Sequence, residues 1–107
     1  MINTAKGIEN CGGEENYNNI IKIFCKDGRK RLENLKKGFE KNDLSLLSIE
    51  THSLKSIAAT LGADELAEYA REVNQICKKD QKSIIASQWQ TVIRMYQEII
   101  EEFENKI

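Results

Sequence analysis

The chain contains no proline in 107 residues, and this absence constrains its fold more than any other feature. Average usage would supply about five prolines, and a proline inside a helix bends or breaks it. The sequence also has no run in which apolar and polar residues alternate for long enough to indicate a strand. It therefore predicts long helices joined by short turns.

Four segments repeat apolar residues at the three- and four-residue spacing of one helix face. They run from Glu14 to Lys41, from Leu44 to Leu61, from Asp64 to Lys79 and from Ile85 to Phe103, the last after residues 80–83. Gly28 is expected to kink or split the first, and Gly62 to end the second. With a short leading helix over residues 4–10, the pattern predicts one all-α domain over residues 1–107. Its expected architecture is an antiparallel up-down four-helix bundle with a short extra N-terminal helix.

Composition argues against several classes of protein. The net charge is −1, which argues against a nucleic-acid binder. The longest apolar runs are far too short for a membrane span, and the N-terminus lacks the charged and apolar regions of a signal peptide. The three cysteines, at positions 11, 25 and 77, form no close pair. This spacing favours reduced thiols in the cytoplasm over a disulfide framework or a zinc site.

The chain has a single histidine, His52, so a site built on several histidines is excluded. On a helical wheel it points about 140° away from the apolar stripe of its own segment, toward solvent. Its neighbours one turn away are mostly small, and Lys55 follows at i+3. An imidazole is a good nucleophile near pH 7. An exposed nucleophile beside a cation meets the needs of phosphoryl transfer, although a lone exposed histidine is more often an ordinary surface residue.

The residues around His52 extend into a longer motif. The run Thr51-His52-Ser53-Leu54-Lys55-Ser56, followed by Leu61-Gly62-Ala63, resembles the signature of histidine-containing phosphotransfer (HPt) domains. That signature has a small residue, His, any residue, Leu, Lys and usually Gly, with Leu-Gly-Ala further on. Gly7-Ile8, Cys11-Gly12-Gly13 and Lys41-Asn42-Asp43-Leu44 are similar to the family's N-terminal lead-in and to the turn before its active helix. The resemblance extends over roughly residues 2 to 106.

The resemblance implies a phosphorelay intermediate of two-component signalling. In such a relay the histidine attacks the phospho-aspartate of a response-regulator receiver domain and then passes the phosphoryl group to an aspartate of another receiver. The implied partners are receiver domains and a hybrid sensor histidine kinase. No cofactor is implied in the chain itself, because the receiver holds the Mg²⁺. No ATP-dependent kinase activity is implied either, and the chain lacks a phosphate-binding glycine loop.

Individual residues carry over from the family signature. The resemblance assigns His52 as the phosphorylated residue, Lys55 as the cation that neutralises the phosphoryl oxygens, and Gly62 as the end of the helix. Ser56 departs from the usual glycine, which lets the receiver approach. We expect this serine to be tolerated and to offer a hydrogen bond to the imidazole or to the phosphate.

Two surface features, one apolar and one basic, would favour the binding of a protein partner. Ile49 is an apolar residue on the His52 side of its helix, and with Ala59 and Ile57 it would form an apolar rim on which a receiver docks. Residues 22–41 carry eight Lys or Arg against three Asp or Glu. This run is either a solvated helix face or a basic surface that steers an acidic receiver pocket toward His52.

Two other functions stay open. A non-catalytic helical adaptor would bind receiver or kinase domains through the same face, and Ser56 is its only support in the sequence. A receiver that binds without transferring phosphate would favour it. The substrate domain of an ATP-dependent histidine kinase also carries its histidine on a bundle helix. Labelling by ATP and an isolated kinase domain, with no receiver present, would favour that function.

Overall fold

The computed structural model describes residues 2–78 and 85–106, with the side chains of residues 85–87 excepted. Five helices make up nearly all of this part: α1 (Thr4–Cys11), α2 (Glu14–Glu40), α3 (Leu44–Leu61), α4 (Asp64–Lys78) and α5 (Ile85–Lys106). No strand occurs within it. The all-α class and the short leading helix are confirmed. The predicted end at Lys79 and the start signal at residues 80–83 lie outside the described residues.

The helix ends follow local capping chemistry. The side chain of Asn3 accepts a hydrogen bond from the backbone N–H of Lys6 at the start of α1, and Asp43 accepts one from Leu46 at the start of α3. Both satisfy backbone donors that the first turn leaves free. Gly12 and Gly62 end α1 and α3 in the left-handed region, with φ of +80° and +86°. Gly62 therefore ends the second predicted helix as its sequence indicated.

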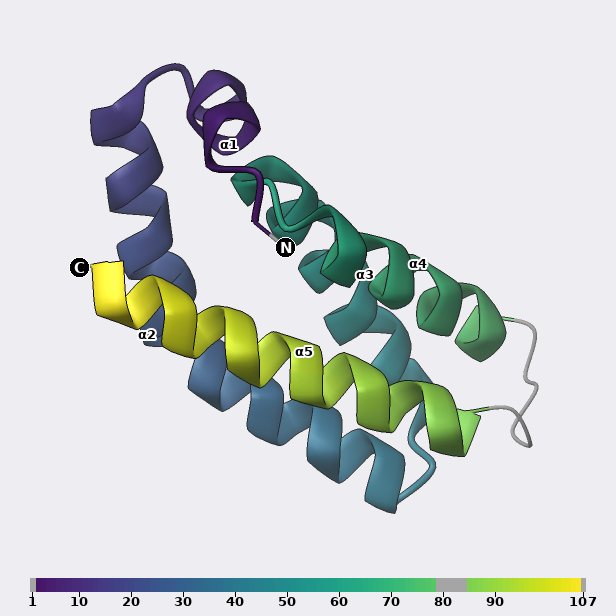
Figure 1. The fold of residues 1–107 in the computed structure, drawn as a ribbon. Coiled ribbons are helices and arrows are strands. Elements are labelled where there is room, and N and C mark those ends of the chain that lie inside the picture. Colours follow the sequence, from purple (N-terminus) through teal and green to yellow (C-terminus); the bar gives the residue numbers. More distant parts are fainter. Residues whose placement is uncertain (1, 79–84, 107) are drawn as a thin grey trace.

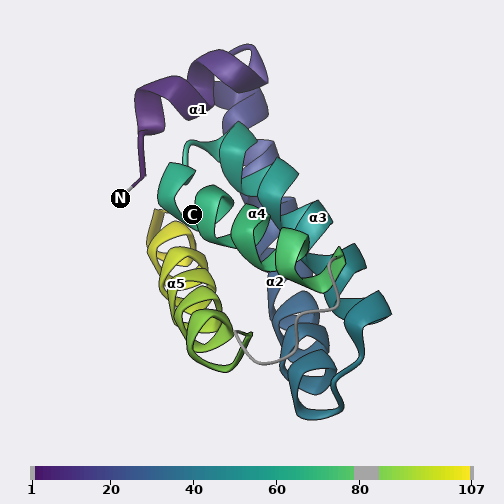
Figure 2. The same cartoon turned by 90° about the vertical axis from the view of Figure 1, so that its right-hand side faces the viewer.

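The long helices lie in two neighbouring pairs. In Figures 1 and 2, α2 runs beside α5 and α3 runs beside α4, while α1 crosses one end of the molecule. Backbone contacts fix that end, because the N–H of Asn3 donates to the carbonyl of Gly62 at 2.8 Å. The amide of Asn10 donates to the carbonyls of Ala59 and Thr60, both at 3.3 Å. Helix α1 therefore covers the C-terminal end of α3.

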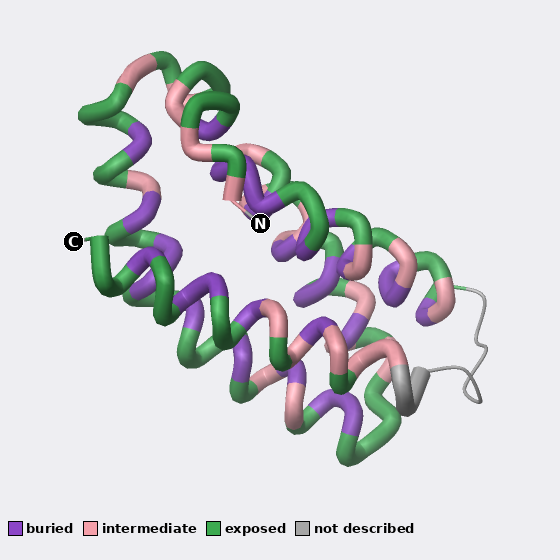
Figure 3. Tube along the Cα trace, viewed as in Figure 1, coloured by how far each residue is buried: buried purple, intermediate pink, exposed green. Residues whose placement is uncertain are grey.

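The buried stripes of the helices face one another, as the tube in Figure 3 shows. Aromatic rings pack between α2 and α5. The ring centroid of Phe24 lies 5.6 Å from that of Tyr96 and 5.7 Å from that of Phe103. Phe39 stacks on Trp89 at 4.0 Å. Within the described part of the chain, no helix combines the length and the apolar character that a membrane span requires.

Gly28 was expected to kink or split the first long helix; the helix is not split, although its ribbon changes direction partway along in Figure 1. Helix α2 continues from Glu14 to Glu40. A Cβ at position 28 would lie 3.0 Å from Cδ1 of Ile100 on α5. The glycine thus allows α5 to approach α2 closely, and the resulting packing holds the helix together through it.

Candidate functional site

Helix α3 turns His52 outward. Its neighbour Thr51 is fully buried, as are Leu47, Leu54 and Ala58 on the same face, whereas His52 is exposed. The 3.6-residue repeat of a single helix is enough to produce this division. The predicted exposure of the imidazole is therefore confirmed.

The side chains one turn away from the imidazole on α3 are two serines, Ser48 and Ser56, together with Ile49 and Lys55. Lys55, one turn on, is half-buried and forms no salt bridge with any residue that the structure describes. Ser45 and Ala59 are exposed, and Ser48 is half-buried. A partner can therefore approach the ring, and the ammonium of Lys55 is uncommitted.

Ser56 uses its hydroxyl within the helix. It donates to the backbone carbonyl of His52 at 3.4 Å, which is the i−4 bond that serine and threonine often form in helices. Thr60 repeats the pattern by donating to the carbonyl of Ser56 at 2.9 Å. The expected bond from Ser56 to the imidazole is absent from these described contacts. The hydroxyl therefore bonds to the backbone of α3, and the side chain itself is small.

A hollow of about 200 Å³ opens between α2 and α3, next to the residue that follows His52 in the sequence. Ser53 and Ile57 of α3 face Ile23 of α2 across it, and Tyr96 of α5 also lines it. Burial raises the pKa of Tyr96 far above its usual value, so its phenol stays protonated. Sequence reasoning missed this hollow, because it depends on which face of α2 meets α3.

Two large apolar side chains are exposed among the described residues: Ile23, at 60%, and Ile49, at 62%. Ile49 lies one turn before His52 on α3, as predicted, and Ile23 lines the hollow on α2. Ala59 is exposed and Ile57 is half-buried. Ile57 and Ile23 line the same hollow, so the apolar surface that includes the predicted rim continues from α3 onto α2.

Two of the basic residues on α2 form ion pairs with other helices. Arg29 pairs with Glu104 at 2.6 Å and Arg31 with Glu50 at 3.3 Å. These two cations serve partly to join α2 to α5 and to α3. Sequence reasoning missed Glu50, whose side chain is 9% exposed and lies on the face of α3 that turns toward α2.

Lys26 and Lys30 lie on the side of α2 that turns toward α3. Both are exposed and line a shallow hollow beside Arg31 and Glu50, between α2 and α3. They belong to no salt bridge in the described part of the chain. Because they lie next to α3, these two lysines are the members of the basic run best placed to steer an acidic partner toward that helix.

A polar contact lies beneath the turn that carries His52. Asn74 of α4 is 3% exposed, and its side-chain amide donates to the carbonyl of Ser48 at 2.8 Å and to the hydroxyl of Thr51 at 3.1 Å. Thr51 in turn donates to the carbonyl of Leu47 at 2.7 Å. The sequence feature that could have indicated this contact is Asn74 itself, a single amide among the apolar residues of the buried face of α4.

The chain was compared with protein-family models, with curated proteins and with solved structures. The model of the Hpt domain matches residues 19–105, most of the chain. The chain belongs to the Hpt domain family. No curated protein and no solved structure matched.

The matched region of this Hpt domain covers α2 to α5, apart from the first five residues of α2 and the last residue of α5. Helix α1 and the lead-in motifs at residues 7–13 lie outside it. The family works in two-component phosphorelays, where a histidine exchanges a phosphoryl group with receiver domains. His52 is the only histidine of this chain.

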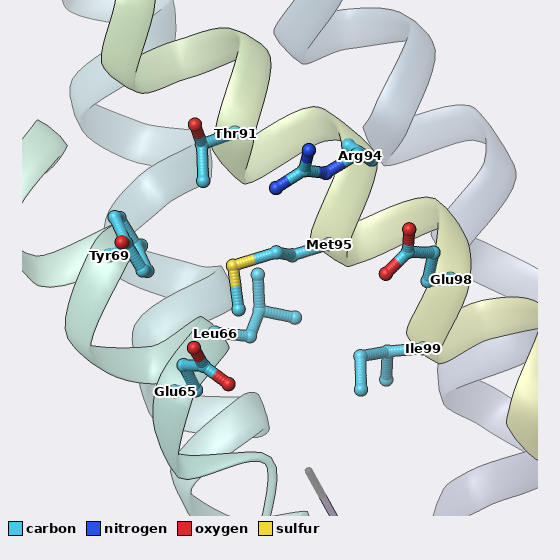
Figure 4. A pocket seen from close by; sticks show the side chains of 8 residues that line it. All are labelled: Glu65, Leu66, Tyr69, Thr91, Arg94, Met95, Glu98 and Ile99. Carbon is cyan, nitrogen blue, oxygen red and sulfur yellow. The ribbon is translucent and has the colours of Figure 1, made fainter.

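A further hollow of this Hpt domain, shown in Figure 4, lies between α4 and α5. Met95 reaches across it toward Leu66, and charged side chains of both signs stand around it, namely Glu65, Arg94 and Glu98. No residue of α3 lines it, so it is separate from the surface around His52. Among the described residues, no group of three or more His, Cys, Asp or Glu side chains is arranged to hold a metal ion.

Proposed function

We propose that this Hpt domain is a phosphorelay intermediate that accepts a phosphoryl group on His52 from the aspartate of one receiver domain and delivers it to the aspartate of another. The observation that carries the proposal is the position of the chain's single histidine. It is exposed on α3, inside the family region, with Lys55 one turn away and an apolar surface beside it.

The chemistry is an in-line transfer between nitrogen and oxygen. A lone pair on a ring nitrogen of His52 attacks the phosphorus of the receiver's acyl phosphate. The N–P bond forms as the P–O bond to the aspartate breaks, and the carboxylate leaves with that electron pair. The other ring nitrogen keeps its proton. Delivery to the second receiver is the same step in reverse, with a new carboxylate as nucleophile.

Lys55 acts on the charge of the transferred group. Its ammonium lies on the same side of α3 as the imidazole, and no described acidic side chain neutralises it. Phosphoryl transfer depends largely on positioning and on compensation of the charge on the phosphoryl oxygens. Mg²⁺ held in the acidic pocket of the receiver supplies further charge compensation, and the Hpt domain itself holds no cofactor.

The receiver docks on the face that α2 and α3 share. Ile49, Ser56 and Ala59 border the imidazole on α3, and Ile23 extends the apolar area across the hollow. Exposed apolar area of this kind favours a protein partner. Lys26 and Lys30 stand beside it, and their charge attracts the acidic pocket of a receiver before contact.

We also propose an architecture and a cellular context for the domain. Helices α2 to α5 form an antiparallel up-down four-helix bundle, which is supported by the short connections between them and by the pairs α2–α5 and α3–α4 in Figure 1. The domain works in the cytoplasm, because its receivers do. Its phosphoryl groups come originally from a hybrid sensor histidine kinase.

Incubation with a ³²P-labelled phospho-receiver tests the acceptance step. We expect label on the Hpt domain that is labile to acid and stable to base, as a phosphorus–nitrogen bond requires, and no label on His52→Gln. Equal labelling of that variant would refute the proposal. Labelling by ATP and an isolated kinase domain, without transfer from any receiver, would instead support a kinase substrate domain. Binding without transfer would support an adaptor.

A further inference from the structure

We infer that Asn74 is a positioning residue for phosphoryl transfer at His52, because its side-chain amide fixes the turn of α3 that carries the imidazole. The inference rests on the proposed function and names a residue of α4 that touches neither the imidazole nor the surface on which the receiver docks. It follows from where the two amide hydrogens of Asn74 go.

Both amide hydrogens of Asn74 reach the backbone turn beneath His52. One bonds the carbonyl of Ser48 at 2.8 Å, and the other bonds the hydroxyl of Thr51 at 3.1 Å. In an α-helix the carbonyl of residue 48 also accepts the backbone N–H of residue 52. Asn74 therefore bonds to α3 at the carbonyl that also accepts the backbone N–H of His52, and at Thr51, the residue before His52.

These bonds are the polar link between α3 and α4 in the described part of the chain. The remaining buried side chains of α4 are apolar or a thiol: Leu66, Ala67, Ala70, Val73 and Cys77. An apolar contact between two helices is nondirectional, so it tolerates a small roll or slide. A buried amide that donates hydrogen bonds does not, because a shift would leave a buried polar group without its partner, which is costly.

The acceptors do not themselves need Asn74. Thr51 already donates to Leu47 at 2.7 Å, and the carbonyl of Ser48 already has its partner within the helix. Replacement of Asn74 by the similarly sized Leu would therefore leave no buried group of α3 without a partner. Removal of the amide therefore leaves α3 without an unsatisfied group. Its expected effect is that α3 is no longer held in one rotational position about its axis.

A small roll is enough to matter for transfer. The tip of a side chain stands roughly 6 Å from the helix axis, so a roll of about 10° moves the imidazole by about 1 Å. A displacement of that size in a reacting group can slow a reaction by about 100-fold. Glu50, paired with Arg31 at 3.3 Å, braces the other side of α3, but Arg31 is 44% exposed and its long side chain can follow a roll. Asn74 is the stiffer of the two constraints.

The test compares Asn74→Leu with Gln75→Leu, a matched control at the exposed neighbouring position of α4. Three quantities are measured for each: the free energy of unfolding, the affinity for an unphosphorylated receiver, and the single-turnover rate constant of transfer from the phospho-receiver. For Asn74→Leu we expect unchanged stability and affinity with a transfer rate at least about tenfold lower. Gln75→Leu should match the wild type in all three.

A small phosphoryl donor distinguishes poor alignment with the receiver from a general loss of reactivity of the imidazole. Phosphoramidate transfers its phosphoryl group to imidazole nitrogen as its own P–N bond breaks and ammonia leaves, and it needs no docked geometry. Asn74→Leu should react with it at the wild-type rate. Thr51→Val, which removes one of the two acceptors, should show a smaller loss with the receiver, and Thr51→Ser should restore the wild-type rate.

The outcomes separate this inference from the proposed function. A wild-type protein that takes no phosphate from any receiver overturns both. A wild type that accepts phosphate while Asn74→Leu transfers equally fast overturns the role of Asn74 alone. The same holds if the loss with the receiver is matched by a loss of affinity, of stability or of reactivity with phosphoramidate. If Asn74→Leu does not fold, the comparison of Thr51→Val with Thr51→Ser decides the question.

Discussion

Two glycines with the same backbone conformation should respond very differently to alanine. Gly12 and Gly62 end α1 and α3 with φ of +80° and +86°. A Cβ costs about 1–2 kcal/mol in this left-handed region. A Cβ added at Gly12 would meet only the side-chain nitrogen of Asn16, at an ordinary contact distance of 3.8 Å. Gly12→Ala should therefore show the conformational cost alone.

At Gly62 the added carbon has no room. It would overlap the carbonyl oxygen of Asn3 and lie 3.0 Å from the carbonyl carbon of the same residue. Backbone atoms cannot turn aside as a side chain can, so the start of α1 must move. That movement breaks the bond from Asn3 N–H to the carbonyl of Gly62 and strains the bonds of Asn10. At about 1 kcal/mol per hydrogen bond, the total loss should reach about 2–4 kcal/mol.

Urea denaturation followed by far-ultraviolet circular dichroism measures both losses. We expect Gly62→Ala to lose at least about 1 kcal/mol more than Gly12→Ala. Hydrogen exchange should also speed up at Asn3 and Gly7 in Gly62→Ala, because α1 is then loosened. Equal losses for the two variants, with unchanged exchange in α1, would show that α1 does not depend on its contact with the end of α3.

Three further outcomes follow from the site and from the buried thiols. Lys55→Ala should slow transfer from a phospho-receiver by roughly tenfold or more with an unchanged free energy of unfolding; an unchanged single-turnover rate would remove Lys55 from the mechanism. Ile49→Ser should weaken receiver binding by about tenfold in calorimetry, since burying a side chain that is 62% exposed is worth about 1–2 kcal/mol; an unchanged affinity would place the docking surface elsewhere. Burial raises the pKa of Cys25 and Cys77, so both thiols stay protonated at pH 8. Iodoacetamide should therefore modify the half-buried Cys11 first, which intact-mass analysis would show. Equal rates of modification at all three cysteines would contradict the burial of Cys25 and Cys77.

The parts of the fold and site that local rules decide were predictable from the sequence. Asp43 and Gly62 bound α3 through capping that involves only neighbouring residues. The exposure of His52 follows from the helical repeat, because each residue's direction is fixed by its distance along the chain from the buried stripe. The same repeat correctly set Ile49 on the His52 side.

The parts that depend on which helix faces meet were not predictable. Gly28 predicted a kink or a split, and its close packing against Ile100 of α5 keeps α2 continuous. The role of Asn74 depends on α4 lying against the turn of α3 beneath His52. The hollow beside Ile23 likewise exists only because α2 and α3 leave it between them. A single sequence carries no information about such pairings beyond the length of each helix and the polarity of its faces.

A relay between two receivers tests the central claim most directly. A ³²P-labelled phospho-receiver is mixed with a second, distinguishable receiver, with and without the Hpt domain, and the label on each protein is followed over time. The account predicts that label passes through the Hpt domain to the second receiver, and that neither step occurs with His52→Gln. Label that reaches the second receiver equally well through His52→Gln, or that never leaves the first receiver with the wild type, would contradict it.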